Sequence, residues 1–179
     1  MKTIRVGNGC GFWGDNLDAP VRLTEPGGLD YLTLEYLAEL TMSILALQKQ
    51  RDPQAGFARD FLDVLERLAP LWKAQPGLKI ITNAGGMNPE GCARLARSVL
   101  DRAGLSERAI ATVEGDDLLP DLDPLLTAGH TLAHLDTGEP LATIRECVVS
   151  ANAYLGAGPI AAALKLPGVA LVITGRVAD

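Results

Sequence analysis

Two carboxylates near the start of the chain lie directly after predicted strands, where an acid or base can meet a substrate. Asp15 follows the glycine-rich residues 7–14, and Glu35 lies near the end of the apolar residues 30–36. A carboxyl group placed against a substrate can transfer a proton in the transition state. We predict Glu35 and Asp15 as the catalytic acid or base, with solvated loop carboxylates as the alternative. Other carboxylates at predicted strand ends are Glu114, Asp116 and Asp179.

Amide, hydroxyl and glycine residues recur at the same strand ends and predict a ligand site. Asn83 and the backbone N–H groups of Gly85 and Gly86 would bind a carbonyl or phosphate oxygen. Arg176 would pair with a ligand anion or with a neighbouring acid. Asparagines also serve turns and helix caps, and Tyr154 is either a hydroxyl donor or a packed ring. The predicted ligand-binding residues are Asn8, Asn83, Gly85, Gly86, Asn152, Tyr154, Thr174 and Arg176.

Other reaction chemistries find little support in the sequence. His130 and His134 have the spacing of a zinc pair, but Thr131 stands where a metallopeptidase helix has glutamate, so we predict structural histidines and no metal. Cys10 lies in a strand-end loop but has no histidine close in sequence. Cys92 and Cys147 are predicted core residues. The nucleophile-elbow and phosphate-loop motifs are absent, and the sequence leaves any cofactor unassigned.

The element that must position this site is the strand–loop–helix unit of residues 78–104. Lys79–Thr82 is a short apolar run typical of a buried strand, followed by the glycine-containing loop 83–87. Asn88 then suits a helix N-cap and Pro89 the first helical position. Gly104 suits the end of that helix. Such a unit directs backbone N–H groups at whatever lies above the end of the strand.

Strands and helices alternate along the rest of the chain. Because the strands are short apolar runs, we predict an α/β fold: a mainly parallel sheet, helices on both faces, doubly wound, with a partial β/α barrel as the alternative. The loop after the first strand is predicted to lack a helix. On the helix 37–49, Leu40, Ile44 and Leu47 share one face, and Pro70 bends or ends the helix 57–75. Predicted strands are residues 3–6, 30–36, 79–82, 110–113, 146–151 and 169–174, and further helices are 89–103, 125–135 and 160–164.

Composition limits the class of protein. The 179 residues, 47% of them apolar, suit a single α/β domain over residues 1–179. The net charge of −6 argues against a nucleic-acid partner, and no apolar stretch is long enough to cross a membrane. Three scattered cysteines and the lack of a signal peptide favour the cytoplasm.

Five stretches resemble the N-terminal region of the acyclic terpene utilisation A (AtuA) family in order and spacing. They are Ile4–Asp15, Leu29–Glu39, Thr82–Pro89, Ser150–Ala157 and Ile173–Asp179. Members of that family continue beyond the last stretch. The resemblance therefore implies that the chain is the N-terminal portion of a longer protein. A homo-oligomer is the alternative to a missing C-terminal portion, formed through sheet edges that the ends of the chain leave uncovered.

The resemblance implies a part in the bacterial catabolism of acyclic terpenes such as citronellol and geraniol, a pathway that uses coenzyme A thioesters. The reaction of the family is not assigned, so no catalytic residue is transferred from it. The functional hypothesis is an enzyme, or a subunit of one, acting on a branched acyl or acyl-CoA intermediate. The alternative is a non-catalytic module that binds a metabolite or another subunit.

Overall fold

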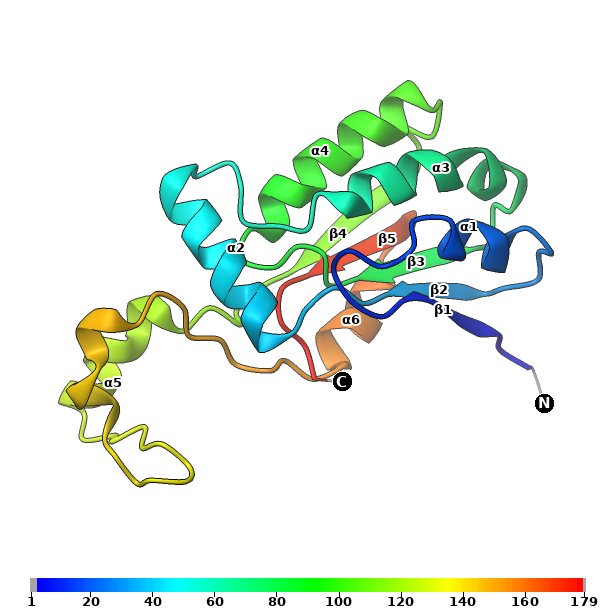
Figure 1. Cartoon of the computed structure of the whole chain (residues 1–179). Helices are drawn as coiled ribbons and strands as arrows, with labels where there is room; N and C mark the ends of the chain where they lie inside the picture. Colours follow the sequence, from blue (N-terminus) through cyan, green and yellow to red (C-terminus); the bar gives the residue numbers. More distant parts are fainter. Residues whose placement is uncertain (1–2, 179) are drawn as a thin grey trace.

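The centre of the molecule is a five-stranded sheet in the order β1-β2-β3-β5-β4, with every neighbouring pair of strands parallel (Figure 1). The computed structural model describes residues 3–178. Within them β1 and β4 form opposite edges, so the sheet is open and the predicted α/β class is confirmed, whereas the barrel alternative is not supported. The strands are Val6–Cys10 (β1), Tyr31–Leu34 (β2), Lys79–Thr82 (β3), Ala109–Val113 (β4) and Val169–Thr174 (β5).

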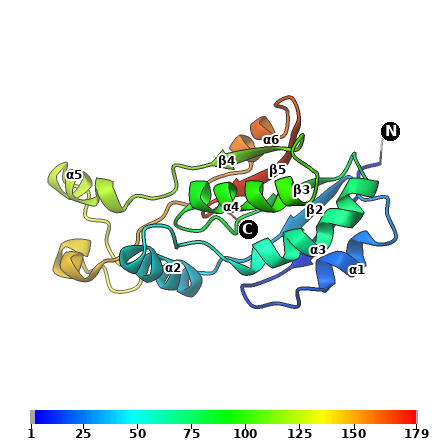
Figure 2. The ribbon, with the colours of Figure 1, turned by 90° about the horizontal axis from the view of Figure 1, so that it is seen from above.

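Helices cover the two faces of the sheet unequally. Helices α1, α3 and α4 lie on one face, α6 lies on the other, and α2 lies beyond the carboxyl ends of the strands (Figures 1 and 2). The α-helices are Ala19–Thr24 (α1), Glu39–Arg51 (α2), Asp60–Ala74 (α3), Pro89–Arg102 (α4), Leu122–Thr127 (α5) and Gly158–Ala163 (α6). Short 3₁₀ turns span Leu119–Asp121 (η1), Leu141–Thr143 (η2) and Arg145–Cys147 (η3).

The handedness of parallel crossovers explains this distribution. From β1 to β2, from β2 to β3 and from β3 to β4, the chain moves in one direction across the sheet. Its helices therefore lie on one face, because such connections are right-handed. From β4 to β5 the chain moves back, so the connecting helix α6 lies on the opposite face.

The main core lies between the sheet and helices α3 and α4. The indole of Trp72 is fully buried there and its Nε1 donates a 2.8 Å hydrogen bond to the Leu78 carbonyl. The Arg108 guanidinium lies 5.0 Å from the Trp72 ring centre and donates to the carbonyls of Pro76 and Trp72 at 2.9 and 3.1 Å. Helix α3 continues through Pro70 to Ala74, so the proline does not end the helix.

The first strand and the helix after it differ from the prediction. Strand β1 begins at Val6 instead of Thr3 and includes Gly7 and Gly9, and α1 occupies part of the stretch predicted to be irregular. A Cβ atom on Gly9 would lie 3.0 Å from Pro20, and one on Gly7 would lie 2.9 Å from the Leu23 side chain. These glycines therefore allow α1 to pack closely on β1, a role that the sequence pattern does not separate from that of a turn.

The face of α2 that carries Leu40, Ile44 and Leu47 is not its buried face. Leu40, Ile44 and Leu47 are 72%, 40% and 43% exposed, whereas the buried residues of this helix are Met42, Leu45 and Ala46. Apolar residues occur on both sides of α2, so their spacing alone does not select the buried side. The position of α2 beyond the strand ends decides it, because the sheet is not beneath this helix.

Residues 117–152, called the arm below, extend away from the sheet past α2 (Figures 1 and 2). Here the predicted strand 146–151 and the predicted helix 125–135 are wrong: α5 ends at Thr127 and a 3₁₀ turn covers Arg145–Cys147. A strand needs a neighbouring edge to pair with, and in the described structure the arm makes only an isolated bridge between Asp117 and Asn152 at its base. Cys147 is consequently exposed instead of belonging to the core.

The arm also holds both histidines, which are exposed and lie outside any helix. His134 Nδ1 accepts hydrogen bonds from the backbone N–H groups of Asp136 and Thr137, both at 3.2 Å, so it has a turn-forming role. Within residues 3–178, no group of three histidine, cysteine or carboxylate residues is arranged to hold a metal. No helix in the same residues has both the length and the apolarity to cross a membrane.

We expect Gly85→Ala to lower the free energy of unfolding by about 1–3 kcal/mol, because the core has no room for the added methyl group. A Cβ atom there would lie 2.5 Å from the Thr174 carbonyl oxygen and 2.9 Å from Pro89 Cα. Urea unfolding monitored by circular dichroism measures the change. Gly77→Ala is the matched control, since a Cβ at Gly77 meets nothing within 4 Å. Equal stability of the two variants would contradict the packing role of Gly85.

Candidate functional site

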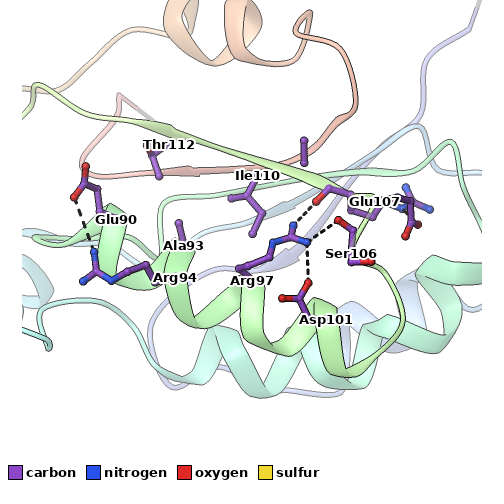
Figure 3. Close-up of a pocket in the computed structure, with 11 residues that line it drawn as sticks. Glu90, Ala93, Arg94, Arg97, Asp101, Ser106, Glu107, Ile110 and Thr112 are labelled. Carbon is purple, nitrogen blue, oxygen red and sulfur yellow. Dashed lines mark hydrogen bonds and ion pairs between the residues drawn. The ribbon is translucent and has the colours of Figure 1, made fainter.

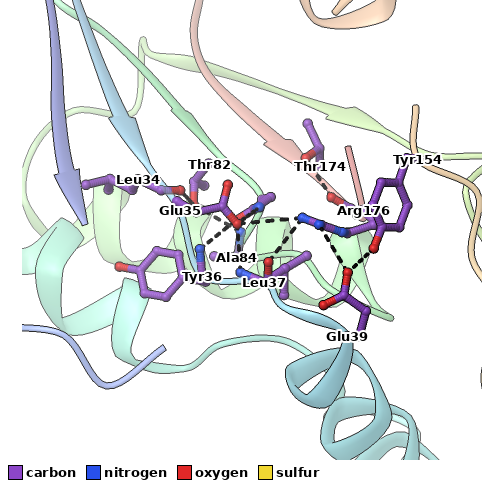
Figure 4. A network of polar contacts seen from close by, with 12 residues as sticks. Leu34, Glu35, Tyr36, Leu37, Glu39, Thr82, Ala84, Tyr154, Thr174 and Arg176 are labelled. Carbon is purple, nitrogen blue, oxygen red and sulfur yellow. Dashed lines mark hydrogen bonds and ion pairs between the residues drawn. The ribbon is translucent and has the colours of Figure 1, made fainter. Parts of the chain in front are cut away.

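The carboxyl ends of β2, β3 and β5 bring three predicted site residues into one polar network (Figure 4). Glu35 follows β2, Asn83 follows β3, and Arg176 follows β5 after one glycine. Asn83 and Arg176 are buried, while the Glu35 side chain is 34% exposed. The network therefore has a fixed inner part and one carboxylate that reaches the surface.

One oxygen of Glu35 is held firmly. Its Oε1 accepts hydrogen bonds from Asn83 Nδ2 at 2.5 Å and from the Leu37 N–H at 2.9 Å, and it lies 3.9 Å from Arg176 Nη1. Asn83 is oriented in turn, because its Oδ1 accepts from the Tyr36 N–H at 2.8 Å. No hydrogen bond from residues 3–178 reaches Oε2 of Glu35, so this oxygen is the one able to face a ligand.

Arg176 is the central cation of the network. Its side chain is 3% exposed, and Nη1 donates to the Leu37 carbonyl at 3.1 Å. The guanidinium lies 4.2 Å from the centre of the Tyr154 ring, and Nη2 lies 3.8 Å from Glu39 Oε1. The Tyr154 hydroxyl donates to the same oxygen of Glu39. That hydroxyl, the Glu39 backbone N–H and the Arg176 charge hold the pKa of Glu39 below its usual range.

Asp116, after β4, ties the loops of the site together. Its buried carboxylate accepts hydrogen bonds from the Arg176 N–H at 2.8 Å and from Asn152 Nδ2 at 3.0 Å. A Cβ atom on Gly175 would collide with this carboxylate, so glycine is needed there. Asp116 thus holds the backbone of Arg176 and the side chain of Asn152 in place next to each other.

A cavity of about 460 Å³ lies beside this network, on the face of the sheet that carries α6. Four predicted site residues line it: Asn8, Glu35, Asn83 and Thr174. Leu34, Ile81, Ile160 and Val177 form its apolar wall, with Thr33 and Thr82 completing the lining. Its size and its mixture of an apolar wall with a few convergent polar groups are those of a small-molecule site.

A second cavity of about 170 Å³ lies on the α2 side of Arg176. Its lining includes the other three predicted polar ligand-binding residues, Asn152, Tyr154 and Arg176, together with Glu39 and Ser43. Glu39 was not predicted as a site residue. An acidic residue in the first turn of a predicted helix is a common stabilising feature, so the sequence offers no signal that separates it from an ordinary helix start.

The remaining predicted residues lie outside both cavities. Asp15 accepts hydrogen bonds from the N–H groups of Gly11 at 2.9 Å and Asn16 at 2.7 Å, which lower its pKa and close the turn after β1. The Gly86 N–H donates to the Asn83 carbonyl at 3.1 Å, and Gly85 packs on Thr174. Catalysis by Asp15 and ligand binding by these glycines stay predictions. Asp179 lies outside the described residues.

Two further sequence expectations can be compared with the structure. Asn88 Oδ1 accepts a 3.0 Å hydrogen bond from the Gly91 N–H, so its predicted N-cap role is confirmed. Cys10 is almost fully buried, with its sulfur donating to the Phe12 carbonyl at 3.3 Å. Burial raises the pKa of this thiol, and the nearby Asp15 and Glu35 charges add to the effect, so Cys10 is not an activated nucleophile.

A larger cavity of about 710 Å³ lies along the outer edge of β4, against α4 (Figure 3). Its charged groups largely pair with one another: Arg97 Nη1 lies 3.2 Å from Asp101 Oδ1, and Arg94 Nη1 lies 4.0 Å from Glu90 Oε2. Arg97 also donates to the carbonyls of Ser106 and Arg108. None of the predicted site residues lines this cavity, and its charges are already satisfied, so we place the site at the strand ends.

A model of the acyclic terpene utilisation family protein AtuA matches residues 4–179. The chain belongs to the AtuA family. The match includes all residues of both site cavities and supports a role in acyclic terpene utilisation. Neither a curated protein nor a solved structure matches the chain.

In this AtuA-family chain, we expect Asp116→Ala to lower the free energy of unfolding by about 1.5–3 kcal/mol, since it leaves two donors without their charged acceptor. Urea unfolding measures the loss, and amide hydrogen exchange at Arg176 should accelerate. Asp117→Ala is the matched control, because Asp117 accepts from the Leu119 N–H at 3.0 Å in a local turn. Similar losses in both variants would show that Asp116 has no special role in fixing the site.

Proposed function

We propose that this AtuA-family protein is an enzyme, or a subunit of one, that performs acid–base chemistry on a branched acyl or acyl-CoA intermediate of acyclic terpene catabolism. The observation that supports it is the placement of Glu35 at the lining of the 460 Å³ cavity, with one carboxylate oxygen fixed. A base that is held in position but still reaches the ligand loses little entropy during proton transfer.

The cavity walls suit a branched hydrocarbon group. Ile81, Ile160 and Val177 would remove its methyl and methylene groups from water, which contributes about 0.8 kcal/mol for each buried CH₂. Glu35 Oε2 would then take a proton from the γ-carbon of an α,β-unsaturated thioester such as geranoyl-CoA. The double bond moves to the β,γ position as the same carboxyl returns the proton to the α-carbon. Asn83 acts as a positioning residue for Glu35, because its Nδ2 donates to Oε1.

The same proposal places the protein in the cytoplasm, where coenzyme A thioesters are used. All three cysteines are free, and one of them, Cys147, is exposed. A reducing compartment preserves an exposed thiol of this kind.

A non-catalytic metabolite-binding module is the second candidate. It is favoured by the contact between Glu35 and Arg176 at 3.9 Å, because a carboxylate next to a buried cation can serve as a fixed recognition group without moving a proton. Removal of the Glu35 charge should lower turnover if the protein is an enzyme, and should lower ligand affinity if it is a binding module.

We expect Glu35→Gln to lower kcat for geranoyl-CoA and related branched thioesters by about 10²–10⁴-fold, as the loss of a general base does. Thermal stabilisation by the same thioesters should persist, because the amide keeps the size of the side chain. Glu66→Gln, the same substitution at an exposed position on α3, is the matched control and should retain turnover. If turnover falls equally in both variants, the assignment of the base to Glu35 is wrong.

Binding at the cavity has its own test. A thioester that binds the folded protein at a hundredfold excess over its dissociation constant should add roughly 2.7 kcal/mol of stability, seen as a higher Tm. Ile160→Trp fills the cavity and should abolish the shift, whereas Leu166→Trp, at a site 55% exposed, should not. Binding without turnover would favour the non-catalytic module, and the absence of both would refute the thioester proposal.

A further inference from the structure

We propose that Arg176, Tyr154 and Asn152 form a binding subsite for a ligand carboxylate, and that the Glu39 side chain occupies this subsite until the ligand displaces it. The proposal rests on the proposed function, since the subsite would hold a second group of the molecule whose branched acyl part fills the larger cavity. It concerns the 170 Å³ cavity on the α2 side of Arg176.

The cation of this subsite is fixed before any ligand arrives. Arg176 is held by the Leu37 carbonyl at 3.1 Å, by the face of the Tyr154 ring at 4.2 Å and by the Asp116 carboxylate, which accepts from its backbone N–H. A guanidinium presents a planar set of donors that matches the two oxygens of a carboxylate. Because its position is already determined, binding such a group costs little ordering of the protein.

Glu39 has the properties of a replaceable occupant. Its side chain is 78% exposed, whereas that of its partner Arg176 is 3% exposed. The 3.8 Å separation between Glu39 Oε1 and Arg176 Nη2 is longer than a direct hydrogen bond. The Glu39 end of the pair is solvated, so this carboxylate can move into water while Arg176 keeps the Leu37 carbonyl, Glu35 and the Tyr154 ring as partners.

The hydroxyl and amide groups around the cation complete the subsite. The Tyr154 hydroxyl, which donates to Glu39, would donate to an incoming carboxylate in the same way. Asn152 and Ser43 also line the cavity. Asn152 Nδ2 donates one hydrogen to Asp116 and has a second to offer a ligand, whereas the Ser43 hydroxyl donates to the Glu39 carbonyl at 3.2 Å. Figure 4 shows the Glu39 carboxylate beside both the Tyr154 hydroxyl and the Arg176 guanidinium, which is the position that a ligand carboxylate would take.

One guanidinium connects the two cavities. Nη1 of Arg176 lies 3.9 Å from Glu35, which lines the larger cavity, while Nη2 lies 3.8 Å from Glu39, which lines the smaller one. A ligand carboxylate at Nη2 would therefore lie near the catalytic candidate. The ligand class that suits this arrangement is a branched acyl compound with a free carboxylate.

Binding of 3-methylbutanoate, measured by isothermal titration calorimetry in a buffer without other carboxylates, tests the proposal. Glu39→Ala removes the internal competitor and should tighten binding by about two- to fivefold, the range of a weak ion pair. The matched alcohol, 3-methylbutan-1-ol, should show no such change. Glu66→Ala, which removes the same charge from an exposed position on α3, should leave the affinity for 3-methylbutanoate unchanged.

A second variant tests the Tyr154 hydroxyl as a donor to the ligand. Tyr154→Phe retains the ring under Arg176 but removes the hydroxyl donor, so it should weaken 3-methylbutanoate binding in the Glu39→Ala background. Equal carboxylate affinity with and without Glu39, or an equal gain from Glu66→Ala, would overturn the subsite. Continued turnover of branched thioesters in that case would leave the proposed function intact. A gain confined to Glu39→Ala would support the subsite even if no thioester were turned over.

Discussion

The buried charge of Arg176 is the constraint around which the carboxyl end of the sheet is organised. A guanidinium withdrawn from water is tolerated only when carbonyls, carboxylates or an aromatic face replace its hydration. Here the Leu37 carbonyl and Glu35 come from the end of β2, while the Tyr154 ring comes from the chain that returns from the arm. Segments far apart in sequence therefore meet at one side chain, and the same groups shape both site cavities.

The topology of the sheet explains why these segments meet. All five strands are parallel, so their carboxyl ends lie along one edge, and ligands of such folds bind outside those ends. Because β5 is inserted between β3 and β4, Arg176 emerges beside the loop that contains Asn83 and beside Asp116 after β4. The reversal that inserts β5 also places α6 on the face opposite to α3 and α4, where the apolar wall of the larger cavity includes Ile160.

The sequence pattern predicted those parts of the fold that depend on interactions between residues close together in the chain. The central unit is an example: Lys79–Thr82 forms a strand and Asn88 caps the following helix, since short apolar runs and capping side chains act within a few residues. The sequence pattern gave the wrong secondary structure where contacts between distant parts of the chain determine it. Gly7 and Gly9 belong to a strand because this segment pairs with β2, and their lack of a side chain lets α1 pack on it. Residues 146–151 do not form a strand, because the arm holds them away from the edges of the sheet.

The sequence by itself determined the α/β class, the AtuA resemblance and the set of polar residues at the strand ends, because alternation, capping and residue type are local properties of the chain. Only the tertiary structure decided how that set divides. It brings Glu35 and Asn83 to one cavity and Tyr154 to another, keeps Asp15 in a local turn, and adds Glu39 from the start of α2. Which residues share a cavity depends on the strand order and on the groups that surround the buried charge of Arg176. Neither can be derived from the spacing of residues along the chain.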